Sequence, residues 1–261
     1  MDRDLVRQAA VVAGVVAGLA SGVTGDYGAA GESESLVLPA DYAFTIWFPV
    51  YGGSLCYAWY QARPVLRRDP LLRRIGWPAA LAYLTAGLWV RTDPTDDVWL
   101  TAAVMVATMA AAGTALVRLG PTEGAEAAER WFVRAPIGLF AGWITLATVA
   151  NTTEALLAND VRALAGLPAP VWAVAALLVA GGIASATTLR TRASLAYPAA
   201  AAWGLLAAAV QQSPRSLAAG ATAAAMAGLV AAAGWRSKRR PATRHPRGAR
   251  AGALRIVPAL R

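Results

Sequence analysis

The chain alternates long apolar runs with short polar segments. Eight of these runs are close to the roughly 20 residues that cross a bilayer as a helix. They cover residues 8–24, 42–62, 76–92, 98–117, 135–157, 170–189, 194–211 and 216–235. Composition agrees, because 57% of the residues are hydrophobic and only 15% are charged, which is little charge for a soluble domain of this size. The pattern predicts an all-α, polytopic membrane helix bundle with about eight transmembrane helices.

Basic residues fall almost entirely on one side of this pattern. Every Lys and Arg except Arg91, Arg162 and Arg215 lies in a segment that is on the inner side if the N-terminus is cytoplasmic. Because Lys and Arg concentrate in cytoplasmic loops, this bias favours an even number of spans. We therefore expect an integral, multi-pass protein of a prokaryotic plasma membrane with both termini cytoplasmic.

The first apolar run has two interpretations. It could be a cleaved signal peptide, since it is short and small residues follow it. Acidic residues offset the arginine in its leader, Met1–Asp4, which argues against a signal peptide. Gly14, Gly18 and Gly22 are spaced four apart and form a small-residue face suited to close helix packing. We favour a retained span.

The end of the chain is a basic tail over residues 236–261. It carries most of the net charge of +9, and a basic segment after a final span typically meets anionic headgroups of the lipid bilayer. Proline and glycine interrupt the tail, so we expect it to be disordered and cytoplasmic. No aromatic residue is interleaved with its charges, so we expect no nucleic-acid partner.

The fifth apolar run carries polar side chains at helical spacing. On a helix they form one stripe beside Trp143 and Ala147. The stripe consists of Thr145, Thr148, Asn151 and Thr152. An unpaired amide in hydrocarbon is costly, so this side of the helix should face protein or a cavity. The stripe is therefore the first candidate for a functional site.

Aromatic residues of other runs reach the same depth as this stripe. The second run enters from outside, which places Trp47 and Tyr51 in its outer half, and the third ends outward near Trp89. The side chains expected to meet between the midplane and the outer face are Phe44, Trp47, Tyr51, Trp89, Trp143, Thr148 and Asn151. Aromatic walls with a few hydrogen-bonding groups are typical of small-molecule pockets.

Most of the remaining tryptophans are expected to lie at the membrane–water interface instead. Indole rings favour the headgroup level, and the tryptophans at predicted span ends are Trp59, Trp77, Trp99, Trp131, Trp172 and Trp235. Trp203 is the one further tryptophan inside an apolar run.

Two sequence blocks carry a family resemblance. Residues 136–151 contain W-x-T-x-A-T-x-x-N behind a proline, and residues 38–51 contain a proline followed by W-x-x-x-Y. Together they resemble the tryptophan-rich sensory protein family, also called the translocator protein or TspO/MBR family. The resemblance covers roughly residues 8–160. The chain departs from the family pattern where Ala40 follows Pro39 in place of a second proline, and where Ala86 replaces an asparagine.

The resemblance implies a division of the chain and a function. It implies a five-helix membrane bundle over residues 1–160, and the apolar runs add three transmembrane helices over 161–235 before the tail. Family members are regarded as membrane receptors or sensors that bind tetrapyrroles such as protoporphyrin and haem, and in some cases sterols. The ligand-binding positions it implies here are Pro39, Trp47, Tyr51, Trp89, Trp143, Ala147, Thr148 and Asn151. We therefore expect a sensor for a planar hydrophobic ligand, with no required cofactor and a tetrapyrrole as the candidate ligand.

The last three runs leave alternatives open. They are rich in alanine and glycine, so they should pack against the five-helix unit or against another copy of the chain as a homodimer. They could instead complete a transport path, with Gly181 and Gly182 breaking the sixth run. A secondary transporter of a small hydrophobic or amphipathic molecule is the alternative function, and a structural membrane subunit is the third.

Catalytic and metal chemistry find little support in the sequence. The only histidine, His245, lies in the tail, so no span offers imidazole to a metal or to haem iron. Cys56 is the only cysteine, and we expect it to be a small buried hydrophobe. No nucleophile-elbow, zinc-protease or P-loop motif occurs. We expect no enzymatic activity, no catalytic residue and no metal site.

Overall fold

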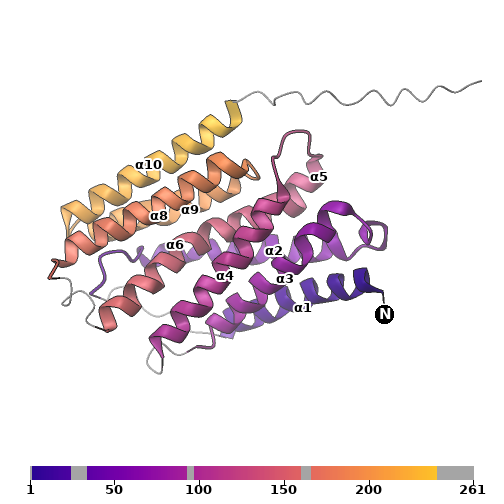
Figure 1. The fold of residues 1–261 in the computed structure, drawn as a ribbon, viewed down its shortest axis with the longest axis horizontal. Coiled ribbons are helices and arrows are strands. Elements are labelled where there is room, and N and C mark those ends of the chain that lie inside the picture. The colour runs from indigo at the N-terminus through magenta and orange to yellow at the C-terminus, as the bar shows by residue number, and fades with distance from the viewer. Residues whose placement is uncertain (1, 25–33, 93–96, 160–165, 240–261) are drawn as a thin grey trace, which may run out of the picture.

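The structure is a computed structural model that describes residues 2–24, 34–92, 97–159 and 166–239 (Figure 1). Within these ranges every regular element is a helix. The long helices are α1 (Arg3–Thr24), α2 (Trp47–Ala62), α3 (Pro70–Trp89), α4 (Val98–Leu119), α6 (Ala135–Ala158), α8 (Ala169–Thr191), α9 (Ala196–Gln212) and α10 (Leu217–Arg239). Each corresponds to one predicted apolar run. The all-α prediction is confirmed for the described residues.

Short elements join these helices, and local sequence explains several of the ends. A 3-10 turn, η2 (Asp41–Ile46), leads into α2, and η3 (Pro64–Leu66) follows it. The three-residue α5 (Ala127–Glu129) continues through a π-turn, η4 (Arg130–Arg134), into α6. Asp69 and Asp97 cap α3 and α4 by accepting hydrogen bonds from backbone N–H groups three residues ahead, at 2.9 and 3.0 Å. Helix α4 ends at Gly120, whose φ of 65° suits glycine.

Several helix boundaries differ from the predicted runs: α2 begins at Trp47 instead of residue 42, α3 begins at Pro70 instead of residue 76, and the first and last long helices are extended. Helix α1 begins at Arg3 instead of residue 8, and α10 continues through Arg239 into the segment predicted to be a disordered tail. The extensions of α1 and α10 carry basic side chains, so the apolar runs did not include them. Long basic side chains are nevertheless tolerated in a helix near a membrane surface, because their charged ends can reach water. The rest of the predicted tail, residues 240–261, lies outside the described residues.

Five helices are long and apolar enough to cross a membrane. They are α1, α4, the continuous run Ala127–Ala158, α8 and α10. Helices α2 and α9 have 16 and 17 residues, and α3 begins with a basic turn containing Arg73 and Arg74 that lowers its mean hydropathy. The structure is that of a multi-pass membrane protein, and the count of eight spans stays a prediction.

The first five long helices close into a ring in the order α1, α3, α4, α6, α2. Each helix of the ring packs against the next, and α2 returns to α1. The last three helices form a group beside this ring, in which α10 packs on both α8 and α9. The group is attached mainly through α9, which packs along α6. The prediction that the last three runs pack against the five-helix unit agrees with this arrangement.

Helices α1 and α3 approach each other closely through glycine. A Cβ atom placed on Gly14 would lie 2.7 Å from the carbonyl oxygen of Ala80, and one on Gly18 would lie 2.9 Å from that of Tyr83. Gly87 meets the backbone of Gly18 from the opposite side. No larger side chain fits between these backbones. The small-residue face predicted for the first run is thus an interface within the bundle.

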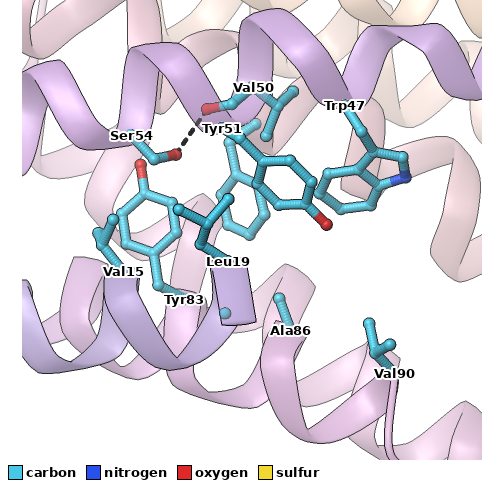
Figure 2. Close-up of a pocket in the computed structure, with 11 residues that line it drawn as sticks. Val15, Leu19, Trp47, Val50, Tyr51, Ser54, Tyr83, Ala86 and Val90 are labelled. Carbon is cyan, nitrogen blue, oxygen red and sulfur yellow. Dashed lines mark hydrogen bonds between the residues drawn. The ribbon is translucent and has the colours of Figure 1, made fainter. Parts of the chain in front are cut away.

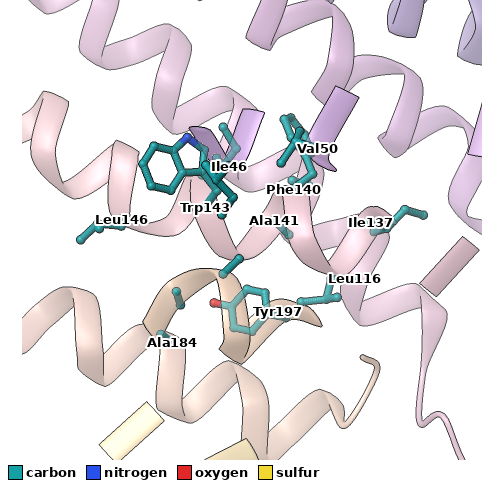
Figure 3. Close-up of a cluster of buried hydrophobic side chains, with 14 of the residues drawn as sticks. Ile46, Val50, Leu116, Ile137, Phe140, Ala141, Trp143, Leu146, Ala184 and Tyr197 are labelled. Carbon is teal, nitrogen blue, oxygen red and sulfur yellow. The ribbon is translucent and has the colours of Figure 1, made fainter. Parts of the chain in front are cut away.

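Glycine also sets the contact between the ring and the last three helices. A Cβ atom on Gly142 would collide with the carbonyl oxygen of Tyr197, and one on Gly204 would collide with Leu146. A Cβ atom on Gly138 would lie 2.6 Å from Ser194 Oγ. Figure 3 shows the side chains at this contact, where Tyr197 lies against α6 below Trp143 and Phe140. Close packing at glycine therefore joins α6 to α9 in the same way as it joins α1 to α3.

Basic residues join the helices at one end of the bundle. The guanidinium of Arg134, 6% exposed, donates to the carbonyl oxygens of Gly120, Leu119 and Ala193 and to the Glu129 carboxylate. Arg73 pairs with Asp4 in the same region. The basic segments that the charge pattern assigned to one side therefore contact one another, although the orientation in the membrane stays a prediction.

The outward faces of the helices are apolar. Phe48 is 80% exposed, and such a surface suits lipid tails. Among the tryptophans predicted at span ends, Trp172 is half-buried. The others are exposed, namely Trp59, Trp77, Trp99, Trp131 and Trp235.

Two smaller expectations are wrong. Helix α8 runs without a break through Gly181 and Gly182, because Met226 of α10 packs against Gly181 and fills the space that a side chain would take. Cys56 is exposed and not buried, because it lies on the side of α2 away from the ring interior.

The glycine contact between α1 and α3 gives a first test. Gly14→Ala should lower stability by about 1–3 kcal/mol, since the added methyl group meets backbone that cannot move aside cheaply. Thermal unfolding of the purified protein in detergent measures the change. Gly113→Ala is the matched control, because a Cβ atom there meets nothing within 4 Å. An equal response of the two variants would contradict the close-packing account.

Candidate functional site

A pocket lies inside the ring between α1, α2 and α3, and one residue of α6 also lines it (Figure 2). Its lining is almost entirely apolar or aromatic. The lining residues are Val15, Gly18, Leu19, Trp47, Val50, Tyr51, Ser54, Tyr83, Ala86, Val90 and Phe140. They come from the second half of α1 and α3 and the first half of α2, which is the depth predicted for the aromatic cluster.

The pocket is narrow as it stands. The empty space among its lining atoms, including the opening, is about 360 Å³. The cavity volume that is available to water is about 20 Å³. That space suffices for on the order of one water molecule. A planar ligand therefore requires the side chains or helices around the pocket to move apart. Leu19 and Tyr51 are half-buried and stand on facing helices, so they can move without opening the core.

Two of the predicted aromatic residues form one wall of this pocket. The rings of Trp47 and Tyr51 are stacked, with centroids 5.1 Å apart and planes 22° from parallel. Trp143 and Phe44 stand behind this wall. The Trp143 ring meets Trp47 edge-on at 6.4 Å, and Phe44 meets Trp143 edge-on at 5.6 Å. Phe44 and Trp143 therefore position Trp47 and do not line the pocket.

Trp89 and Asn151 form a pair of their own. The indole N–H of Trp89 donates to Asn151 Oδ1 at 2.9 Å, and Asn151 Nδ2 donates to the carbonyl oxygen of Ala147 at 2.9 Å. Both groups of the amide are engaged within the protein. Neither Trp89 nor Asn151 lines the pocket. The pair ties the end of α3 to α6.

The other predicted residues are also outside the pocket. The Thr148 hydroxyl donates to the carbonyl oxygen of Ile144 at 2.8 Å and lies 3.3 Å from that of Met105 on α4. Ala147 is half-buried on α6, and Pro39 is buried in the segment before α2. The polar stripe of α6 thus faces protein, as its composition predicted. Trp47 and Tyr51 are the two predicted site residues that the pocket brings together.

The pocket also contains residues that the sequence analysis did not select. Tyr83 of α3 and Ser54 of α2 meet at its inner end, and their hydroxyl groups lie side by side (Figure 2). Phe140 of α6 stacks on Tyr83, with centroids 4.8 Å apart. The only sequence signal for these residues is position: Ser54 falls one turn after Tyr51 on α2, and Tyr83 falls one turn before Ala86 on α3.

The segment before α2 is held by α9. The indole N–H of Trp203 donates to the carbonyl oxygen of Ala43 at 3.0 Å, and Gln212 Nε2 donates to that of Leu38 at 2.8 Å. The backbone N–H of Ala40 donates to the carbonyl oxygen of Ala207 at 3.3 Å. This segment runs directly into Trp47. The last three helices therefore help to set the position of the pocket wall.

The fold and this site define a class: an all-α, multi-pass membrane protein with an aromatic-walled pocket inside a five-helix ring. The model of the TSPO-like protein family matches residues 9–235. The chain belongs to this family, which confirms the resemblance found in the sequence. The match extends beyond residues 8–160 and includes α8, α9 and α10.

No curated protein and no solved structure matches the chain.

The contacts of α9 with the segment before α2 give a second test. The double variant Trp203→Phe and Gln212→Leu removes two hydrogen bonds, each worth about 1 kcal/mol. Amide hydrogen exchange of residues 35–46, followed by mass spectrometry, should become about tenfold faster or more. Trp235→Phe is the control, because Trp235 stacks with Arg239 at the other end of α10. Unchanged exchange in the double variant would show that α9 does not hold the segment.

Proposed function

We propose that the protein is a membrane receptor or sensor that binds a planar hydrophobic molecule in the pocket of the five-helix ring. The observation that carries this proposal is the stacked pair Trp47 and Tyr51 on the wall of a pocket whose lining is almost entirely apolar or aromatic. Flat rings of a ligand can extend such a stack. A tetrapyrrole, such as a porphyrin or haem, is the ligand class that family membership suggests.

The lining chemistry supports an apolar ligand. Its polar side-chain atoms are confined to the indole N–H of Trp47 and the hydroxyl groups of Tyr51, Ser54 and Tyr83. No acidic or basic side chain lines the pocket, and none of the described residues forms a cluster that could hold a metal ion. The charged edge of a tetrapyrrole would therefore remain at the outer opening, near the start of α2, while its rings enter the pocket.

The packing around the pocket suggests how binding is signalled. Helix α1 cannot shift easily against α3, since Gly14 and Gly18 lock the two backbones. The wall that carries Trp47 is α2, which continues into the segment held by α9. A ligand that widens the pocket would displace α2 and thereby change the contacts of that segment. In this account the last three helices receive the signal.

Binding of protoporphyrin tests the proposal directly. Trp47→Ala should raise the Kd by about fivefold, since losing a stacked ring typically removes about 1 kcal/mol. Titration of the protein in lipid nanodiscs, followed by porphyrin absorbance, measures the Kd. Trp235→Ala is the control, because this exposed tryptophan is remote from the pocket.

The outcomes separate a sensor from its alternatives. Saturable binding that weakens in Trp47→Ala and not in Trp235→Ala supports the proposed pocket. Absence of saturable binding to the parent protein, or equal Kd values for all three proteins, would contradict it. Accumulation of porphyrin inside sealed vesicles that contain the protein would favour a transporter instead.

A further inference from the structure

The inner end of the pocket holds a buried hydroxyl group, that of Tyr83, whose one polar neighbour in the described part of the chain is the Ser54 hydroxyl. Tyr83 is 5% exposed, and its hydroxyl oxygen has no hydrogen-bond partner of standard geometry among the described residues. Figure 2 shows this hydroxyl at the end of the pocket opposite Trp47, beside the hydroxyl of Ser54. A buried hydroxyl whose one protein contact is poorly aligned is costly in an apolar surrounding, so a better-placed acceptor inside the pocket would stabilise it.

The neighbouring serine leaves the Tyr83 hydrogen available. The Ser54 hydroxyl donates its hydrogen to the carbonyl oxygen of Val50 at 2.7 Å, so Ser54 cannot donate to a ligand at the same time. The Tyr83 hydroxyl can donate, and its hydrogen can reach either Ser54 Oγ or a group inside the pocket. The inner end of the pocket therefore offers one donor.

The surroundings decide which acceptor suits that donor. None of the lining residues is charged, so a carboxylate at this depth would be buried without a counter-ion. The amide of Asn151, which the sequence indicated as the polar contact, is already bound to Trp89 and Ala147. An uncharged oxygen, such as that of a ketone, ester or amide, satisfies the donor without this penalty.

We propose that Tyr83 is a specificity-determining residue, and that the pocket selects flat apolar ligands with an uncharged carbonyl oxygen at their inner end. This inference rests on the proposed function, because it concerns the same pocket. It adds a direction to the ligand: the carbonyl oxygen points inward to Tyr83, and any charged group points outward. A tetrapyrrole whose only polar substituents are carboxylates would offer the Tyr83 hydroxyl no uncharged carbonyl oxygen, and Ser54 Oγ would remain its acceptor.

A pair of small probes tests this inference. Fluorenone and fluorene are uncharged, planar tricycles of similar size, and only fluorenone has a carbonyl oxygen. Their Kd values are measured in nanodiscs by quenching of tryptophan fluorescence, for the parent protein, Tyr83→Phe and Tyr57→Phe. Tyr57 is the matched control: it is fully buried, its ring is 6.4 Å from that of Tyr83, and it does not line the pocket.

The quantity compared is the ratio of the two Kd values, fluorene over fluorenone, since this ratio cancels changes common to both probes. In Tyr83→Phe the ratio should fall about fivefold, the effect of one neutral hydrogen bond. In Tyr57→Phe it should stay as in the parent. A ratio that is unchanged in Tyr83→Phe, or that falls equally in both variants, overturns the inference.

The failure of the inference is distinguishable from failure of the proposed function. If fluorene and fluorenone both bind saturably and Tyr83→Phe leaves their ratio unchanged, the pocket binds planar molecules without selecting a carbonyl oxygen. If neither probe nor protoporphyrin binds the parent protein, the proposed function fails and the inference fails with it.

Discussion

Close contact between helix backbones at glycine is the constraint on which the rest of this structure depends. Lipid tails are as apolar as the helix surfaces, so burial of apolar area supplies little force to join helices in a membrane. Packing must come from shape, and Gly14 and Gly18 let α1 lie directly on the carbonyl groups of Ala80 and Tyr83. This contact fixes the backbone of Tyr83. The position of the inner end of the pocket thus follows from the absence of side chains at Gly14 and Gly18.

The same rule attaches the last three helices, and this attachment gives them a role. Gly142 and Gly204 bring α6 and α9 together, and α9 in turn holds the segment that enters α2. The pocket is consequently built from one rigid side, α1 with α3, and one side whose position depends on a distant part of the chain. The match to the family model spans residues 9–235 and thus includes the last three helices together with the five-helix ring.

The sequence predicted the helices well because the period and length of apolar runs are local properties. It also predicted the glycine face of α1, and it selected Trp47 and Tyr51. It could not separate residues that line the pocket from residues that support it. Asn151 is satisfied by Trp89, 62 positions away, and no local pattern indicates that pairing. Tyr83 was missed because a single tyrosine in an apolar run is usually core, and only the surrounding helices place its hydroxyl beside Ser54 at the end of the pocket.

The central claim is that a flat ligand enters the interior of the five-helix ring. A second apolar hollow competes for such a ligand on the outside of the ring, lined by Thr45, Ile46, Pro49, Leu139, Ala199, Ala200 and Trp203. The most direct measurement is a crystal structure of the protein with a bromine-substituted fluorenone, in which anomalous scattering locates the bromine atom. The account predicts a peak between Trp47 and Tyr83. A single peak in the outer hollow beside Trp203 would contradict it.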